Sequence, residues 1–399
     1  MSTVTLQSAD SVLKSVYLDA VCDQLNNKTS YFYNQIAKGS EEICGKEVRF
    51  PAKSGINGGM GSASETGTLP VSAGNVYADF RCDLKNLYGT IELSDKVIRS
   101  SGSSAGALVN VLSAEIDGLL EAAKFNFQRM LFGNGSGIVG ELKSAIVTGK
   151  LGQAAVKSHV NFNEGMVLDL YTNPGQPGPT GLRVTYVDRN EAGDGTVYFE
   201  PSVSSAIASN TSANSFFTLQ GSYNAEINGL EHLFDATPNA RLYGLDRTTI
   251  KGILPIGKTD TTFTEDGLIQ FIDRIELKSG AKPNVIIASL DARRKFLDVF
   301  SGNRSNTQVL DINGGYRAMS FNEIPVVTDR FAPNGTMYFL NTNDFKLAQI
   351  SDWQWMENDK GNILSQLEKR PVFTATLVKY ANLICKKPGG QGKYSGIVV

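Results

Sequence analysis

One stretch of the sequence has the residue types and spacing of a phosphate-binding loop. Residues 252–259 read GILPIGKT, which satisfies the pattern GxxxxGK[ST]. In such a loop the backbone amides hold phosphate oxygens, Lys258 would reach the terminal phosphates, and Thr259 would hold magnesium. The loop should follow a buried strand and open directly into a helix, but here the next helix is predicted to begin only near Thr264. The four variable positions are also bulky, so we interpret the stretch as an apolar loop that anchors one domain.

The other candidate motifs also lack the context that their chemistry needs. Gly135, Gly137 and Gly140 formally match the dinucleotide pattern GxGxxG, but they follow a predicted helix instead of a strand, which favours a helix stop and a turn. His159 and His232 are the only histidines, and neither is spaced as a metal ligand from a cysteine or from the other histidine. The sequence therefore predicts no catalytic, cofactor-binding or metal-binding residues, no cofactor, and no enzymatic activity.

Composition and charge narrow the class of protein further. The 399 residues carry a net charge of −2, which excludes a histone-like neutraliser of phosphate. The basic run at residues 291–295 is interpreted as a solvated helix face and not as a nucleic-acid site. Four cysteines, Cys22, Cys44, Cys82 and Cys385, lie far apart without a CxxC pair, which is typical of reduced thiols in a cytosolic protein. No run of apolar residues is long enough for a membrane helix, and the N-terminus does not read as a signal peptide.

The elements of the chain are organised around one long predicted helix at residues 105–132. Its apolar residues recur at steps of three and four, the period of a single buried face. At 1.5 Å per residue such a helix is ~42 Å long, so it needs partners along its whole length. We expect β-structure from distant parts of the chain to lie on this strut.

Before the strut, the sequence predicts an arm and a finger. An amphipathic helix is predicted at residues 8–26 and a short aromatic helix at residues 29–37. Strands at residues 46–51 and 77–84 enclose a glycine-rich tip with too few apolar residues to form a core. We expect this two-stranded finger to become ordered on another subunit.

After the strut, the pattern changes twice. Residues 166–233 are almost purely β in character and predict a small inserted β-domain, with a polar loop at residues 202–215. Residues 264–300 read as two capped helices around a buried strand, which is α/β architecture in miniature. Strands dominate again from residue 324, with a tight hairpin turn at Asn334-Gly335, and the basic, glycine-rich tail from residue 386 is expected to be loosely held.

This order of arm, glycine-rich finger and strut resembles the major capsid proteins of tailed bacteriophages, which have the Hong Kong 97-type fold. Residues 91–101, IELSDKVIRSS, look like the entry to that family's spine helix, and residues 131–137, LFGNGSG, look like its exit. The resemblance implies an α+β fold with an N-terminal arm, an extended β-hairpin loop, a long spine helix, and peripheral and axial domains, plus the β-rich insertion. The match is by order along the chain more than by any single motif.

The resemblance also implies boundaries for these parts. They are the N-terminal arm at 1–45, the extended loop at 46–88, the peripheral domain at 89–135 and 333–385 with the spine helix at 105–132, the axial domain at 136–332 containing the insertion at about 160–240, and the C-terminal tail at 386–399.

The function that the resemblance implies is a structural shell protein. Such a protein would assemble into hexamers and pentamers as the icosahedral head around double-stranded DNA, in the virion and first in the bacterial cytoplasm. Its expected partners are other copies of itself, a portal protein, decoration proteins and the packaged DNA, without any membrane. Because the arm-like helix begins within ten residues of Met1, we also expect a separate scaffolding protein. The alternatives are a cellular nanocompartment shell of the same fold and a nucleotide-binding enzyme that uses Lys258.

Overall fold

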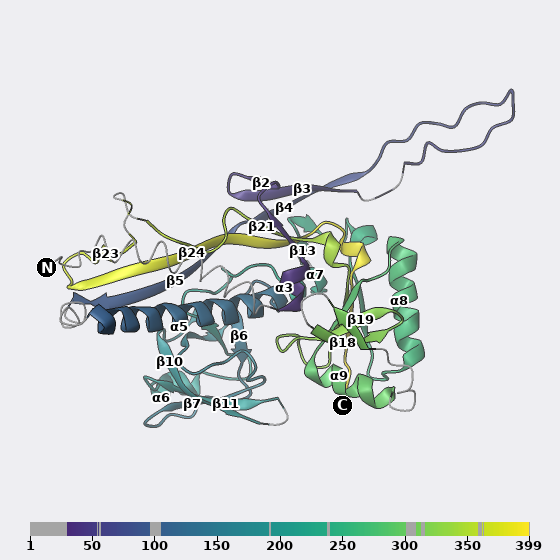
Figure 1. Cartoon of the computed structure of the whole chain (residues 1–399). Coiled ribbons are helices and arrows are strands. Elements are labelled where there is room, and N and C mark those ends of the chain that lie inside the picture. The colour runs from purple at the N-terminus through teal and green to yellow at the C-terminus, as the bar shows by residue number, and fades with distance from the viewer. Residues whose placement is uncertain are drawn as a thin grey trace. The chain divides into compact units, whose positions relative to one another are not determined.

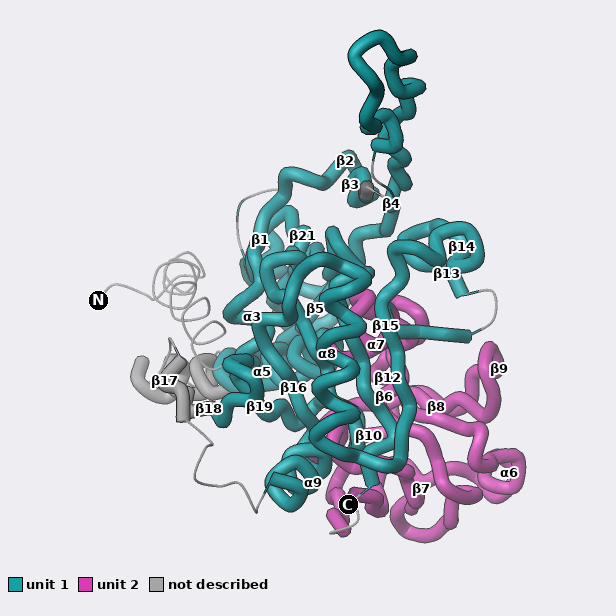
Figure 2. Tube along the Cα trace, turned by 90° about the vertical axis from the view of Figure 1, so that its right-hand side faces the viewer, with its two compact units in different colours: residues 1–131, 233–399 teal, residues 132–232 magenta. Residues whose placement is uncertain are grey.

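The computed structural model divides into two units (Figure 2). Unit 1 comprises residues 1–131 and 233–399, and unit 2 comprises residues 132–232. The structure describes residues 30–53, 55, 57–95, 105–190, 193–237, 240–300, 309–312, 316–357, 361 and 363–398. The helix predicted at residues 8–26 lies outside these described residues. No helix in the described part of the chain is long and apolar enough to cross a membrane.

The predicted strut is confirmed as helix α5, Ala105–Phe132. Its described residues bury a face that includes Ile116, Leu120 and Phe127, as the 3.6-residue period predicts. Strand β5 (Lys85–Ser94) runs along the helix in Figure 1. A Cβ at Gly89 in this strand would lie 2.9 Å from Leu119 of the helix, so glycine allows the strand to approach the helix closely.

A six-stranded sheet in unit 1 is built on the long strand β24, Val372–Cys385, which the sequence predicts with the same bounds. β24 pairs antiparallel with β5 over ten residues, from Lys85↔Ala381 to Ser94↔Val372. The remaining strands are β1 (Ala37–Gly39), β21 (Phe345–Gln349), β22 (Gln354–Trp355) and β23 (Ser365–Gln366). The pairing therefore joins segments that lie almost 300 residues apart in the sequence.

The arm and the finger precede this sheet. Helix α3 (Tyr31–Gln35) buries Phe32 and Tyr33. Strands β2 (Ile43–Cys44), β3 (Glu47–Lys53) and β4 (Tyr77–Asp83) form a three-stranded sheet, which confirms the two predicted strands of the finger. Figure 1 shows the segment between β3 and β4 as a long loop that extends away from the sheets of unit 1.

A second, seven-stranded sheet in unit 1 has the order β15-β25-β20-β16-β19-β18-β17. Its strands are β15 (Ile256–Thr259), β16 (Val285–Ala288), β17 (Val309–Ile312), β18 (Tyr316–Phe321), β19 (Ile324–Thr328), β20 (Met337–Leu340) and β25 (Gly392–Ser395). Helices α8 (Glu265–Ser279) and α9 (Leu290–Val299) begin at the predicted caps, since Thr264 and Ser289 accept from the amides of Gly267 and Ala292. One hydrophobic core joins these helices to the sheet through residues such as Phe271, Phe296 and Phe339.

Two expectations about this region are wrong. The tail after residue 386 is not loosely held, because β25 is an interior strand between β15 and β20, and Tyr394 is fully buried. Asn334-Gly335 does not close a tight hairpin, because β19 and β20 pair with opposite edges of β16 and not with each other. Both errors have one cause. The composition of a turn or a tail does not show which strands, distant in the sequence, will pair beside it in the sheet.

Unit 2 is a β-barrel. Its sheet has the order β6-β12-β8-β10-β11-β7, and a bridge between Leu142 and Val156 joins β7 back to the chain that follows β6, which closes the barrel. The strands are β6 (Ile138–Glu141), β7 (Gly152–Val156), β8 (Val167–Asn173), β9 (Gln176–Pro177), β10 (Leu182–Arg189), β11 (Gly195–Glu200) and β12 (Phe216–Leu219). Side chains such as Phe162, Phe199 and Phe217 fill its core.

The barrel differs from the predicted β-rich section in two details. The sequence pattern does not predict β6 and β7, because both strands are short and contain glycine. The predicted polar loop at residues 202–215 contains a short helix, α6 (Ser205–Ser209), capped by Ser204. The other short elements of the chain are α7 (Leu230–Phe234), β13 (Arg241–Leu242), β14 (Leu245–Asp246), η3 (Lys251–Ile253), η5 (Thr342–Asp344) and η6 (Pro388–Gly390).

Candidate functional site: the finger and its base

The stretch that matches a phosphate-binding loop does not have the shape of one. Residues 251–253 form a 3₁₀ turn, and β15 pairs parallel with β25 through Lys258 and Thr259. Lys258 Nζ lies 3.0 Å from Asp260 Oδ2, and the hydrogen bond that the lysine donates to Asp260 raises the pKa of the lysine. Tyr394 donates to the same carboxylate oxygen at 3.1 Å. A strand thus stands where the backbone would have to curl round phosphate, and the lysine already has a carboxylate partner.

The other glycine motif also has a structural role. Gly135 and Gly137 have φ of 85° and 77°. Residues other than glycine rarely adopt such positive values, and the two glycines allow the chain to turn after α5. Gly140 lies in β6, where a Cβ would come within 2.5 Å of the ring of Phe162 in the barrel core. These glycines are explained by chain reversal and core packing.

The two histidines are not brought into a metal site. His159 Nδ1 lies 3.1 Å from the carbonyl oxygen of Asp194. Within the described residues no group of three histidine, cysteine, aspartate or glutamate side chains could hold a metal ion. His232 lies in the short helix α7.

The tip of the finger, residues 57–76, exposes apolar side chains that no core of its own chain covers. Met60 is 95% exposed, Leu69 83% and Val71 87%. The same segment has one charged residue, Glu65, and the two described strands that enclose it end at Lys53 and begin at Tyr77. Exposed apolar side chains on a nearly uncharged segment of this kind are typical of a contact with another protein.

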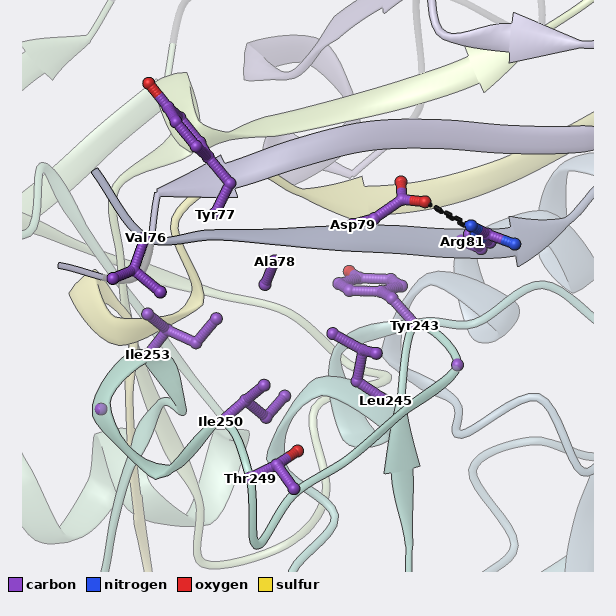
Figure 3. Close-up of a pocket in the computed structure, with 12 residues that line it drawn as sticks. Val76, Tyr77, Ala78, Asp79, Arg81, Tyr243, Leu245, Thr249, Ile250 and Ile253 are labelled. Carbon is purple, nitrogen blue, oxygen red and sulfur yellow. Dashed lines mark hydrogen bonds and ion pairs between the residues drawn. The ribbon is translucent and has the colours of Figure 1, made fainter. Parts of the chain in front are cut away.

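The base of the finger, in contrast, is packed against the rest of unit 1. Phe50 of β3 and Phe80 of β4 lie with ring centroids 5.3 Å apart, and both contact the ring of Tyr243. Beside this aromatic cluster, a groove of about 610 Å³ lies between Val76–Arg81 on one side and residues 243–253 on the other (Figure 3). The finger is therefore anchored at its base and free along its tip. The sequence does not predict a role for Tyr243, because tyrosine is not among the residues that mark a turn with positive φ.

The arm is tied to unit 1 by charge as well as by strand pairing. β1 pairs parallel with β21, and next to it Lys346 Nζ lies 2.9 Å from Glu41 Oε2 and 2.7 Å from Glu42 Oε2. Burial by itself would raise the pKa of Glu42, but Lys346 and Lys386 outweigh it, so the pKa is lowered. The segment that leads from the arm into the finger thus starts from a fixed position.

Comparison with known proteins places these features in a recognised fold. Residues 203–361 match a family model described as the SU10 major capsid protein, which is less than half of the chain. Among solved structures, the capsid of cyanophage A-1(L) is similar over 92% of this chain and 93% of its own, with 11% identity and a TM-score of 0.53. A search of the curated proteins found no sequence that matches this chain.

Two further structures cover nearly the whole chain at lower similarity. One is the SrpI encapsulin of Synechococcus elongatus, with 8% identity, 95% coverage of both chains and a TM-score of 0.45. The other is a structure of Mycobacterium phage Bobi, with 10% identity, 99% coverage of both chains and a TM-score of 0.43.

The family-model match and the cyanophage capsid structure confirm the fold and the resemblance that the order of elements predicts. The fold is the mixed helix-and-sheet fold of Hong Kong 97-like phage capsids. The family-model match and the shared fold together support the resemblance to a tailed-phage major capsid protein.

Proposed function

We propose that this chain is the structural subunit of a phage head. In this role it assembles into hexamers and pentamers that form an icosahedral shell around double-stranded DNA. The observation that carries the proposal is the finger: a tip with exposed Met60, Leu69 and Val71 projects from an anchored base in a protein with a capsid fold. Burying these side chains against a neighbour would add apolar contact, at about 25 cal/mol per Å², without loss of the subunit's own core.

The proposed assembly needs contacts of two kinds. Rings form through heterologous contacts, in which different surfaces of neighbouring subunits meet and the rotation closes. Further contacts then join the rings into a shell. Obligate interfaces of this sort bury on the order of 2,000–5,000 Å², which a projecting finger and an arm supply without enlarging the body of the subunit. The net charge of −2 suits a shell that encloses DNA without binding it tightly.

The proposal extends to the domains and partners that the resemblance implies. α5 would be the spine helix, the sheet of β5 and β24 the peripheral domain, and the sheet that α8 and α9 cover the axial domain. The partners would be a portal protein at one vertex, a separate scaffolding protein, decoration proteins, and DNA held without sequence preference. The site of assembly would be the bacterial cytoplasm, and the final location the virion. No enzymatic step is part of this role.

Electron microscopy of the purified full-length chain tests the proposal. We expect rings or closed shells when the chain is expressed alone or with a scaffolding protein from the same genome. A subunit that stays monomeric at high micromolar concentration under all of these conditions would contradict it. Shells that contain protein cargo and no DNA in the native host would instead favour a cellular nanocompartment. The family-model match argues against that alternative.

A further inference from the structure

The hairpin of β13 and β14 holds an aromatic residue in a backbone conformation that such residues rarely adopt. Its central residues, Tyr243 and Gly244, have φ of 50° and 83°. Positive φ at both positions is the requirement of a type I′ turn, where asparagine, aspartate and glycine are favoured. A bulky residue with positive φ is a genuine outlier, and such outliers persist only where the surroundings compensate for their cost. The contacts of the Tyr243 side chain are the compensation.

Each part of Tyr243 binds a different element at the base of the finger. Its carbonyl oxygen accepts a hydrogen bond from the amide of Arg81 in β4 at 2.9 Å. Its hydroxyl oxygen accepts from the amide of Cys385, at the end of β24, at 2.8 Å. Its ring centroid lies 5.4 Å from that of Phe50 and 5.2 Å from that of Phe80, and the residue is 5% exposed. One residue therefore connects both strands of the finger to the central strand of the six-stranded sheet.

Among the described residues, the backbone hydrogen bonds of β4 to the hairpin of β13 and β14 end at Arg81. The amide of Arg81 points away from β3, so in the antiparallel ladder the backbone groups of Asp79 and Tyr77 point to the same side. That side is the groove of about 610 Å³, with Leu245, Ile250 and Ile253 on its far wall (Figure 3). In the described part of the chain, no backbone group pairs with Asp79 or Tyr77 across the groove. The described backbone attachment of the finger to the hairpin of β13 and β14 therefore lies at the level of Arg81, and the groove lies beyond it.

We infer that Tyr243 is the positioning residue that fixes the direction in which the finger leaves unit 1. The type I′ turn delivers the side chain between the two finger strands and β24, and its contacts hold the base of the finger at one angle. The consequence for assembly rests on the proposed function, because the angle at the base decides where the exposed tip meets a neighbour. The effect on the finger itself is a property of the single subunit.

A distance measurement in the unassembled full-length subunit tests this inference. Spin labels are attached through Tyr77→Cys at the start of β4, where the side chain is 62% exposed, and Leu277→Cys on α8, in a background with Cys22→Ser and Cys44→Ser. Cys82 and Cys385 are buried in the unchanged chain, and intact mass confirms for each variant that only the two introduced cysteines carry a label. We expect one narrow distance distribution for the otherwise unchanged chain. Tyr243→Asn, which suits the turn but lacks the ring and the hydroxyl, should widen that distribution at least twofold.

The controls separate direction from stability. Tyr186→Asn, at a position in the barrel that is 55% exposed, should leave the distance distribution unchanged. A distribution for Tyr243→Asn as narrow as that of the unchanged chain, in a subunit with unaltered circular dichroism, overturns the inference. If Tyr243→Asn gives no folded subunit, Tyr243→Phe decides. This variant keeps the ring but loses the hydroxyl that holds β24, so we expect the width of the distance distribution to rise by about half. Faster hydrogen exchange of the Cys385 amide shows that the hydrogen bond is lost. An unchanged width despite that faster exchange overturns the inference.

The outcome is independent of whether shells form. If the unchanged chain assembles and Tyr243→Asn does not, while its distance distribution widens, both the inference and the proposed function are supported. If the unchanged chain fails to assemble at all, the proposed function fails, but the distance distributions still decide the role of Tyr243.

Discussion

Lys379 and Asp352 form an ion pair in which the lysine is completely buried, with Nζ 2.6 Å from Oδ1. The same ammonium group lies 5.2 Å from the ring centroid of Phe127 in α5 and 5.7 Å from that of Trp353. Burial by itself would raise the pKa of Asp352, but the charge and hydrogen bond of Lys379 outweigh it and the pKa is lowered. The pair therefore links the long strand β24 to the strut and to the chain that follows β21.

Asp352→Asn should destabilise the subunit strongly, because it leaves the buried ammonium group without its carboxylate. Breaking a buried pair in this way costs about 3–5 kcal/mol, and we expect the lower end because the Asp352 side chain is 32% exposed. Urea denaturation of the unassembled subunit measures the loss. The double variant Asp352→Asn with Lys379→Met should recover most of the lost stability, since it leaves no buried charge at this site. A single variant as stable as the unchanged chain would show that the pair contributes nothing.

The carboxyl group of Asp329 should make stability depend on pH in the opposite sense from a salt-bridged acid. Burial raises its pKa, although Ser30 donates to it at 2.6 Å. The pKa of Asp329 in the folded chain is above the unfolded value of about 3.9. Its protonated form therefore stabilises the folded chain, and this contribution is complete when the pH is below about 3.9. This contribution is lost as pH rises through the folded pKa.

Asp329→Asn should therefore gain stability relative to the unchanged chain as pH rises from about 4, because the amide keeps its acceptor but carries no charge. Denaturation midpoints at a series of pH values between 4 and 8 measure the difference. Ser30→Ala is the control, since it removes the hydrogen bond and keeps the carboxylate. A difference that stays constant across the series would contradict the prediction.

Removing the tip of the finger should separate folding from assembly. Replacement of residues 57–74 by Asn-Gly joins the strands of the finger by a short turn, and it removes side chains that are exposed in the single subunit, such as Met60 and Leu69. We expect circular dichroism and thermal unfolding close to those of the unchanged chain, but no closed shells by electron microscopy. Global unfolding of this variant would mean that the tip supports its own subunit, and normal shells would mean that assembly does not use it.

Ile116→Asp should abolish folded subunit. Ile116 has no exposed surface on the buried face of α5, and an unpaired carboxylate there is expected to cost more than about 4 kcal/mol. The neighbouring Asp117→Asn is the matched control, because Asp117 is exposed on the same helix. Soluble yield and circular dichroism compare the two. Folded Ile116→Asp protein would show that this face of the strut is not in the core.

Lys258→Ala should change little. The lysine and Asp260 are partly exposed, at 29% and 28% of their side chains, and pairs near the surface contribute about 0–1 kcal/mol. We expect a small loss of thermal stability, unchanged shell yield, and no nucleotide binding by calorimetry before or after the substitution. Loss of shells together with measurable nucleotide binding by the unchanged chain would restore the phosphate-loop interpretation.

The sequence by itself determined the elements whose signals are local. The period of apolar residues is enough to define α5, since a buried helical face repeats every 3.6 residues. Thr264 and Ser289 mark the starts of α8 and α9 because a cap acts on amides only two or three residues away. The strands of the finger and the bounds of β24 follow from alternation and from turn residues in the same way. From the order of these elements, the capsid fold could be predicted.

Only the tertiary structure decided which distant segments meet. That β25 inserts between β15 and β20, and that the barrel closes through Leu142 and Val156, depends on strand partners far away in the sequence. The burial of Lys379 could not be predicted from the sequence either, because a lysine in a predicted strand normally faces solvent. Tyr243 carries no local signal of its role, and its contacts with Phe80 and Cys385 exist only in the folded chain. Local sequence fixes backbone conformation over a few residues, whereas pairing and burial are set by the whole folded chain.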